Sequence, residues 1–134
     1  MNVIIEHMYQ GDAFSQWLGI RRLEEGPGYC ILEMEVRAEM VNGFGIAHGG
    51  ITYALADSAL AFASNSHGRK AVSIETSINH VKPVMAGDVI RAEAKETSLS
   101  NKLGIYHIRV TRGEELVAHF KGMVYRKEEE WNVI

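Results

Sequence analysis

One acidic residue, Asp57, stands inside a run of apolar residues that has the composition of a helix. Residues 49–66 are rich in Ala and Leu and leave almost no polar face, so the predicted helix should be enclosed by the rest of the chain. An ionised carboxylate taken out of water is costly unless it is paired. We therefore interpret Asp57 as a general base or nucleophile whose desolvation keeps it reactive and raises its pKa. The alternative is an acid that caps a neighbouring loop or reaches solvent at a gap in the sheet.

The segment directly before this helix has the residue types that hold negative charge. It reads Asn42-Gly43-Phe44-Gly45-Ile46-Ala47-His48-Gly49-Gly50. The first amides of a helix have no intrahelical partner, and glycine lets a ligand approach the backbone closely. A developing oxyanion could be held at this end of the helix. The alternative is an ordinary flexible loop with glycine near the start of a helix.

The spacing of these two features predicts how the protein assembles. Gly50 and Asp57 are seven residues apart, which puts them on one helix face but about 10 Å apart along its axis. They cannot both touch one carbonyl carbon. We therefore expect the two groups that face one substrate to come from two copies of the chain, and a two-fold dimer would contain two such sites.

The rest of the chain predicts the elements that position these groups. Asp12 to Gly19 reads as a short capped helix. Apolar and polar residues then alternate with the period of half-buried strands in five places. The members expected to face inward are Cys30, Leu32, Met34 and Val36; Val72, Ile74, Thr76 and Ile78; Ile90, Ala92 and Ala94; Tyr106, Ile108 and Val110; and Leu116, Ala118 and Phe120. Short turns at 86–88, 98–102 and 112–115 favour antiparallel neighbours, so we predict an α+β fold in which a curved antiparallel meander wraps one long central helix.

Length, charge and composition narrow the class of protein. The 134 residues fit one domain, 1–134, and Cys30 has no second cysteine with which to form an intrachain disulfide. A net charge of -3 without a dense basic patch argues against a nucleic-acid partner. The first ten residues do not read as a signal peptide, and no apolar run is long enough for a membrane span, so we expect a cytoplasmic protein without a membrane partner.

A set of spaced motifs resembles the hotdog-fold thioesterases, and within them the branch of the phenylacetic acid degradation thioesterase PaaI. The resemblance covers about residues 13–126. Its motifs are Asn42-Gly43, His48-Gly49-Gly50, Leu55-Ala56-Asp57, Ala71-Val72-Ser73, Pro83 and Ala86-Gly87-Asp88. It implies hydrolysis of acyl-CoA thioesters, typically with aromatic acyl groups, and implies no metal or redox cofactor, coenzyme A being part of the substrate. It also implies a dimer as the catalytic unit, with tetramers made from two dimers.

The resemblance also implies roles for single residues. Asp57 matches the catalytic acid, which acts on the thioester directly or through water, and Gly49 matches the residue whose backbone N–H polarises the carbonyl. Asn42 matches a residue that helps to hold the carbonyl or the water. His48 either contacts substrate or fixes the loop. Ser73 matches a hydroxyl that orients water, or is simply a serine at the edge of a strand.

Substrate contacts are expected from a second group of residues. Gly50 belongs to the helix end, and Phe44 and Tyr53 could line an acyl pocket. Leu60 and Phe62 fit that pocket too, although apolar residues of a buried helix usually belong to the core. Lys82 and Lys102 are preferred over Arg69 and Lys70 for the phosphates of CoA. Between the Asn-Gly and His-Gly-Gly motifs, a linker that is commonly polar contains the apolar residues Phe44, Ile46 and Ala47. The identity of the acyl group is therefore left undecided.

Three rival functions remain beside the hydrolase. A binding module could hold an acyl-CoA without cleaving it, but such a module has no use for a desolvated acid at the reacting carbon. A hotdog dehydratase or hydratase would need an Asp and a His acting together on another loop, and the chain lacks an Asp-x4-His pattern. A structural protein would leave Asp57 unexplained. Residues 127–130, Lys-Glu-Glu-Glu, are predicted to form a solvated tail, which Trp131 could dock against the rest of the protein.

Overall fold

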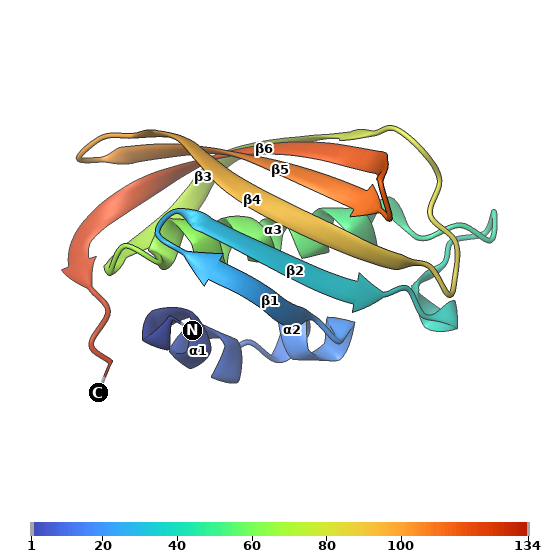
Figure 1. Ribbon diagram of the computed structural model, residues 1–134, viewed down its shortest axis with the longest axis horizontal. Helices are drawn as coiled ribbons and strands as arrows, with labels where there is room; N and C mark the ends of the chain where they lie inside the picture. Colours follow the sequence, from blue (N-terminus) through green and yellow to red (C-terminus); the bar gives the residue numbers. More distant parts are fainter. Residues whose placement is uncertain (1, 134) are drawn as a thin grey trace.

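A six-stranded antiparallel sheet wraps around one long helix in the computed structural model, which describes residues 2–133 (Figure 1). The strands are β1 (Arg21–Gly26), β2 (Tyr29–Glu35), β3 (Arg69–His80), β4 (Val89–Leu99), β5 (Leu103–Arg112) and β6 (Glu115–Glu130). Their order across the sheet is β1-β2-β4-β5-β6-β3, and all neighbours are antiparallel. The predicted α+β architecture with a curved antiparallel sheet is confirmed.

The long helix α3 (Gly49–Asn65) lies along the concave face of the sheet. Its apolar residues meet those of the inner face of the strands, as the alternating pattern predicts. The core is made of these buried side chains, among them Leu55, Leu60, Phe62, Leu32, Met34, Ile90, Tyr106, Ile108 and Phe120. Within residues 2–133, no helix is both long and apolar enough to cross a membrane.

Gly122 of β6 allows the helix to sit this close to the sheet. A Cβ built on Gly122 would lie 2.5 Å from a terminal methyl carbon of Leu60. Because side-chain carbons cannot approach so closely, any larger residue there would push α3 away from β6. The glycine therefore sets the distance between the helix and the strands that flank the site.

The position of β3 differs from the prediction of a simple meander. The turn at 86–88 does not join paired strands, because β3 lies at the edge of the sheet beside β6, while β4 lies between β2 and β5. The physical reason is the length of the connection. Residues 81–88 are enough to carry the chain across the end of the sheet, and Val81 and Lys82 N–H both donate to the Val117 carbonyl on the way, at 2.8 and 3.1 Å.

A β-bulge in β3 also overturns the predicted alternation of that strand. The register with β6 shifts between Ser73 and Glu75, so Ile74 is an extra residue. A one-residue slip exchanges the two faces of a strand. Ser73 therefore comes to the helix side, whereas Val72 and Ile74, predicted to be core residues, are 50% and 55% exposed.

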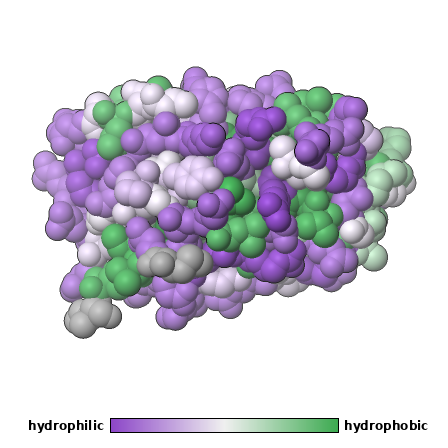
Figure 2. All heavy atoms as spheres, viewed as in Figure 1, coloured by the Kyte–Doolittle hydropathy of each residue, from purple (hydrophilic) through white to green (hydrophobic). Residues whose placement is uncertain are grey.

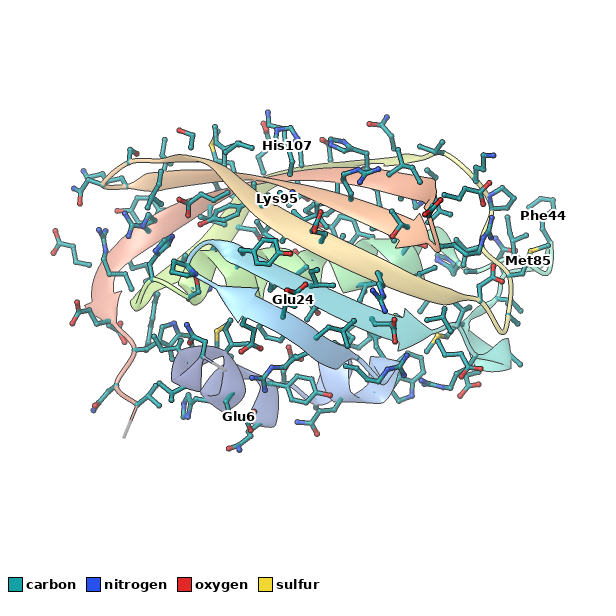
Figure 3. The ribbon with its side chains drawn as sticks, viewed as in Figure 1. Glu6, Glu24, Phe44, Met85, Lys95 and His107 are labelled. Carbon is teal, nitrogen blue, oxygen red and sulfur yellow. The ribbon has the colours of Figure 1, made fainter. Side chains whose placement is uncertain are left out.

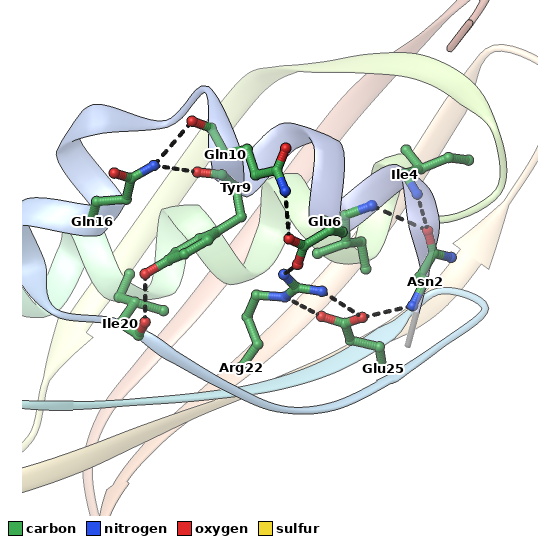
Figure 4. Close-up of polar contacts among 10 residues, drawn as sticks. Asn2, Ile4, Glu6, Tyr9, Gln10, Gln16, Ile20, Arg22 and Glu25 are labelled. Carbon is green, nitrogen blue, oxygen red and sulfur yellow. Dashed lines mark hydrogen bonds and ion pairs between the residues drawn. The ribbon is translucent and has the colours of Figure 1, made fainter. Parts of the chain in front are cut away.

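The N-terminal elements were largely missed by the sequence analysis. The short helix α2 (Ala13–Leu18) is confirmed, with Asp12 accepting from Ser15 N–H and Gly19 in the left-handed conformation. Helix α1 (Val3–Gln10) and strand β1 were not predicted. Figure 4 shows how polar contacts fasten α1 to β1: Arg22 pairs with both Glu6 and Glu25, and Tyr9 donates to the Ile20 carbonyl at 2.8 Å.

Residues 127–130 are exposed to solvent, as predicted, but they do not form a free tail. These residues extend β6, where Glu130 pairs with Arg69 of β3. The predicted docking of Trp131 is confirmed, because its indole N–H donates to Asn65 Oδ1 at 2.8 Å and its backbone N–H donates to the Gly68 carbonyl. The pairing with β3 and the contacts of Trp131 hold this charged segment in the sheet, because exposed charges cost little there.

Candidate active site

Asp57 lies half-buried on α3 and faces a pocket of about 240 Å³ between the helix and β3. Leu60, Ala61, Ser64, Ala71, Val72, Ser73 and Val124 form the rest of its lining. Within residues 2–133, the carboxylate accepts no hydrogen bond and forms no ion pair, so it does not cap a loop. Burial, with a smaller contribution from the charge of Asp12, raises the pKa of Asp57 above its ordinary value. This is an acid kept unpaired beside a mostly apolar pocket.

Ser73 lies in the same pocket because of the bulge in β3. If β3 were a regular strand through Ile74, Ser73 would share the outer face with Glu75. The structure thus brings together Asp57 and Ser73, two of the residues expected at the reaction centre.

The loop before α3 is built around Asn42. Its side-chain oxygen accepts from Phe44 N–H at 2.9 Å and from Ile46 N–H at 3.4 Å, and its backbone N–H donates to the Ile46 carbonyl. This geometry fixes the loop that leads to Gly49. It also uses the oxygen of Asn42 within the loop, so the side-chain amide N–H₂ is the part of Asn42 left to hold a carbonyl or a water.

His48 caps the helix. Its Nδ1 accepts from Gly50 N–H at 3.1 Å, which requires an unprotonated Nδ1 and leaves the ring proton of the neutral form on Nε2. This contact fits the loop-fixing role considered for His48. Gly50 N–H is thereby occupied, while Gly49 N–H, at the first position of the helix, has no acceptor within residues 2–133. Gly49 is therefore the amide free to bind a ligand.

Helix α3 and strand β3 run side by side in opposite directions, and three contacts follow this pairing. Asp57 shares its pocket with Ser73. One turn earlier, Tyr53 Oη lies 2.7 Å from Thr76 Oγ1. At the start of the helix, a Cβ built on Gly49 would lie 3.2 Å from His80 Nε2. Tyr53 thus lies between Gly49 and Asp57 on α3, and its ring packs edge-on against Phe120.

One chain does not bring Gly49 and Asp57 together. They are eight residues apart on one straight helix, which is about 12 Å along its axis. A thioester carbonyl bound at Gly49 is therefore out of reach of Asp57 in the same chain.

The apolar residues considered for the acyl pocket fall into different places. Leu60 lines the Asp57 pocket, whereas Phe62 is buried in the core against Tyr9. Phe44 is 89% exposed at the tip of its loop. Figure 3 shows Phe44 and Met85 together at the end of the molecule where α3 begins, and Figure 2 shows apolar surface at the same end.

The basic residues considered for CoA differ in how free they are. Lys82 pairs with Glu115 at 2.8 Å, and Lys70 pairs with Glu129 and lies over Trp131. Arg69 donates to the carbonyls of Lys127 and Arg126 and to Asn101. Lys102 is exposed and forms no ion pair within residues 2–133. Across the same residues, no cluster of three or more metal-ligating side chains is present.

His80 was missed by the sequence analysis. A usable signal was present, because His80 has the same parity in β3 as Thr76 and Ile78, the residues that face α3. Thr76 contacts Tyr53, and the helix runs antiparallel to β3. Four residues further along the strand, His80 therefore lies opposite Gly49, which is four residues earlier on the helix. Asp12, whose charge acts on Asp57, was predicted only as a helix cap.

Comparisons with known proteins agree with this geometry. Residues 44–119 match the Thioesterase superfamily. A relative from Archaeoglobus fulgidus is 42% identical over 127 residues, 94% of this chain and 82% of the relative. The acyl-coenzyme A thioesterase PaaI of Escherichia coli is 37% identical over 120 residues, 89% of this chain and 86% of the relative.

Solved structures show the same fold. The structure of the E. coli PaaI protein from the phenylacetic acid degradation operon has a TM-score of 0.91 at 34% identity and covers 93% of this chain and 91% of its own. The TT0310 protein of Thermus thermophilus has a TM-score of 0.85 at 41% identity, over 87% of this chain and 98% of its own. The chain therefore belongs to the thioesterase superfamily, has its hotdog fold and is a thioester hydrolase.

Proposed function

We propose that this protein hydrolyses an aromatic, phenylacetyl-type acyl-CoA to the free acid and CoA, with Asp57 as the catalytic carboxylate. The observation that carries the proposal is the unpaired, half-buried Asp57 carboxylate facing its pocket in a member of a thioesterase family. The acyl-CoA substrate is supported by the similarity to the E. coli acyl-coenzyme A thioesterase. The residues 1–134 act as one domain in this proposal.

The reaction begins with the thioester carbonyl accepting a hydrogen bond from Gly49 N–H at the positive end of α3. In one route, Asp57 takes a proton from water and the hydroxide attacks the carbonyl carbon. In the other, the Asp57 carboxylate attacks the carbon and forms a mixed anhydride, which water then hydrolyses. In both routes the C–S bond breaks and the CoA thiolate leaves, to be protonated by solvent. Ser73 orients the water, and the Asn42 side-chain amide helps to hold the carbonyl or the water.

Asp57 and Gly49 of one site come from two subunits in this proposal. The separation of about 12 Å along α3 requires it if both groups act on one carbon. The outer edge of β3 has no neighbour strand within residues 2–133, and Val72 and Ile74 are exposed there. An open edge with apolar side chains is a surface on which a second copy can continue the sheet. Two such dimers form the tetramer that the family resemblance implies.

The acyl group enters the pocket lined by Leu60, Ala61, Ala71 and Val124 beside Asp57. The mostly apolar lining suits an aromatic ring, whose transfer from water is favourable. Phe44 completes the pocket from the subunit that supplies Gly49. Tyr53 completes it from the face of α3. Lys102, which is free of ion pairs, binds a CoA phosphate, and Lys82 does so by exchanging its pairing with Glu115.

The test is release of free CoA thiol from phenylacetyl-, hydroxyphenylacetyl-, benzoyl- and fatty acyl-CoAs by the wild type. Hydrolysis fastest on an aromatic thioester supports the proposal, whereas preference for a long fatty acyl chain refutes the acyl assignment. Tight binding of these thioesters without turnover would instead show a binding module. Cys30 does not disturb a thiol assay, because it is buried and burial raises its pKa to about 12.

A further inference from the structure

The imidazole of His80 lies against the first residue of α3, and the mechanism above gives it no part. A Cβ built on Gly49 would lie 3.2 Å from His80 Nε2 and 3.5 Å from Cε1. The ring therefore occupies the space beside the Gly49 α-carbon that a side chain would otherwise fill. All three atoms nearest to that Cβ position belong to the His80 ring.

The position of His80 is fixed by its strand and not by chance packing. His80 pairs with Ala118 of β6, and the next two amides along the chain both donate to the Val117 carbonyl. It shares the inner face of β3 with Thr76, which contacts Tyr53 of α3. The antiparallel course of β3 and α3 then places residue 80 at the start of the helix.

His80 and Gly49 are both unsatisfied donors. Within residues 2–133, the His80 ring makes no hydrogen bond, and it is exposed. The other histidine at this end differs, because His48 Nδ1 is occupied by Gly50 N–H. A carbonyl oxygen has two lone pairs, and it gains negative charge when the carbon is attacked. One oxygen could therefore accept from both Gly49 N–H and an N–H of His80.

We propose that His80 is a further catalytic residue, whose Nε2–H donates the second hydrogen bond to the thioester carbonyl oxygen held by Gly49 N–H. This inference rests on the proposed thioesterase function. No covalent step is added: the imidazole keeps its proton, and its hydrogen bond shortens as the oxygen becomes an oxyanion. Removal of one such donor typically lowers kcat by about 10²–10³-fold.

Two variants of similar size separate hydrogen bonding from packing. In His80→Gln, the side-chain amide N–H₂ replaces Nε2–H at a similar distance from the backbone, whereas His80→Phe fills the space against Gly49 without a donor. We expect His80→Phe to lower kcat by about 10²-fold with a small change in KM, and His80→Gln to retain most of kcat. Because residue 80 is exposed at the end of a strand, both variants should fold, which circular dichroism and the oligomeric state check.

A spectroscopic measurement gives an independent reading. A CoA analogue in which a methylene replaces the sulfur has a ketone at the reacting position, and a ¹³C label there reports hydrogen bonding by a downfield shift. We expect a large downfield shift with the wild type and with His80→Gln, and a smaller one with His80→Phe. Equal shifts in all three proteins, or equal activity of His80→Phe and the wild type, would overturn the role of His80. Equal losses in both variants would also overturn it, because they would indicate a packing role.

The outcome is distinguishable from failure of the proposed function. If the wild type hydrolyses thioesters and Asp57→Asn does not, the proposed function stands whatever His80 does. If the wild type hydrolyses none but binds the ketone analogue, the proposed function fails and the ¹³C shifts alone decide on His80. If the wild type neither hydrolyses nor binds, both proposals fail.

Discussion

Two inactive variants, Gly49→Pro and Asp57→Ala, should recover about a quarter of the wild-type activity when their subunits are mixed in equal amounts. Proline at position 49 removes the N–H that holds the carbonyl. The backbone at this position tolerates it, because Gly49 is the first residue of α3 and His48 already has the extended conformation, φ -57° and ψ 136°, that a residue before proline adopts. Removing this donor should cost about 10²–10³-fold in kcat.

The expected fraction follows from the composition of the sites. A mixed dimer has one site with both Gly49 N–H and Asp57 intact and one site in which both are changed. Random pairing makes about half of the dimers mixed, so about one site in four is intact. Each variant alone should retain at most about one hundredth of the wild-type activity, so the recovery is readily measured by thiol release after co-refolding or co-expression.

Gly49→Ala is the matched control for the proline variant. It places the same Cβ against His80 Nε2 but keeps the N–H, so it separates loss of the donor from displacement of His80. If the mixture shows no more than the sum of the two variants, while size measurements confirm mixed dimers, the composite site is wrong. Activity of a monomer would contradict it equally.

Four further outcomes are expected. Burial is the main cause of the raised pKa of Asp57, and the charge of Asp12 adds to it. Asp12→Asn keeps the cap of α2 but removes that charge, so the acid limb of the kcat/KM profile should move to lower pH; an unmoved limb would separate Asp12 from the reactive carboxylate. Asp57→Asn should stabilise the fold near neutral pH. Because the pKa of Asp57 is higher in the folded state than in the unfolded state, the wild-type protein loses stability as the pH rises from the unfolded pKa through the folded pKa. The gain in Tm of the variant over the wild type should therefore grow over that pH range and vanish below it. Gly122→Val should lower the free energy of unfolding by about 1–3 kcal/mol because it collides with Leu60, as denaturant titration would show; Gly43→Val, at a position with no atom within 4 Å of the added Cβ and no positive φ, is the control for an added valine side chain. Cys30 should resist a thiol reagent in the native protein and react once on unfolding; rapid native labelling would contradict its burial.

The sequence predicted the central helix well because its signals are local. The apolar run, the glycines before it and the polar Asn65 at its end mark helix α3 almost to the residue. The alternation of β2, β4 and β5 was equally readable, since each strand has one face in the core. Asp57 was conspicuous for the same reason, as the acid that broke an apolar pattern.

The features that were missed depend on contacts between distant segments. The bulge at Ile74 turns Ser73 toward Asp57, but alternation alone predicted an unbroken strand. Strand β1 is mostly polar, and its pairing with β2 and the contact of Arg22 with Glu6 of α1 hold it in place. The neighbour of β3 could not be read from turn length, because pairing with β6 is decided across the whole sheet.

Among the site residues, the sequence indicated which residues to examine and the structure shows how they are arranged. Helix geometry predicted the separation of Gly50 and Asp57, and the same argument holds for Gly49, because all three residues belong to α3. The family resemblance already pointed to Gly49 N–H, and the structure adds a physical reason, because the His48 cap occupies Gly50 N–H. The contact between His80 and Gly49 required the register of β3 against α3.

The most direct test of the central claim compares wild type and Asp57→Asn for thiol release from the best aromatic acyl-CoA. Asparagine preserves the size of the side chain but can neither accept a proton nor attack the carbonyl. The account predicts a loss of kcat of about 10²-fold or more, with the fold, the oligomeric state and binding of the ketone analogue retained. An Asp57→Asn protein that hydrolyses the thioester within a few-fold of the wild type would show that another group carries the reaction.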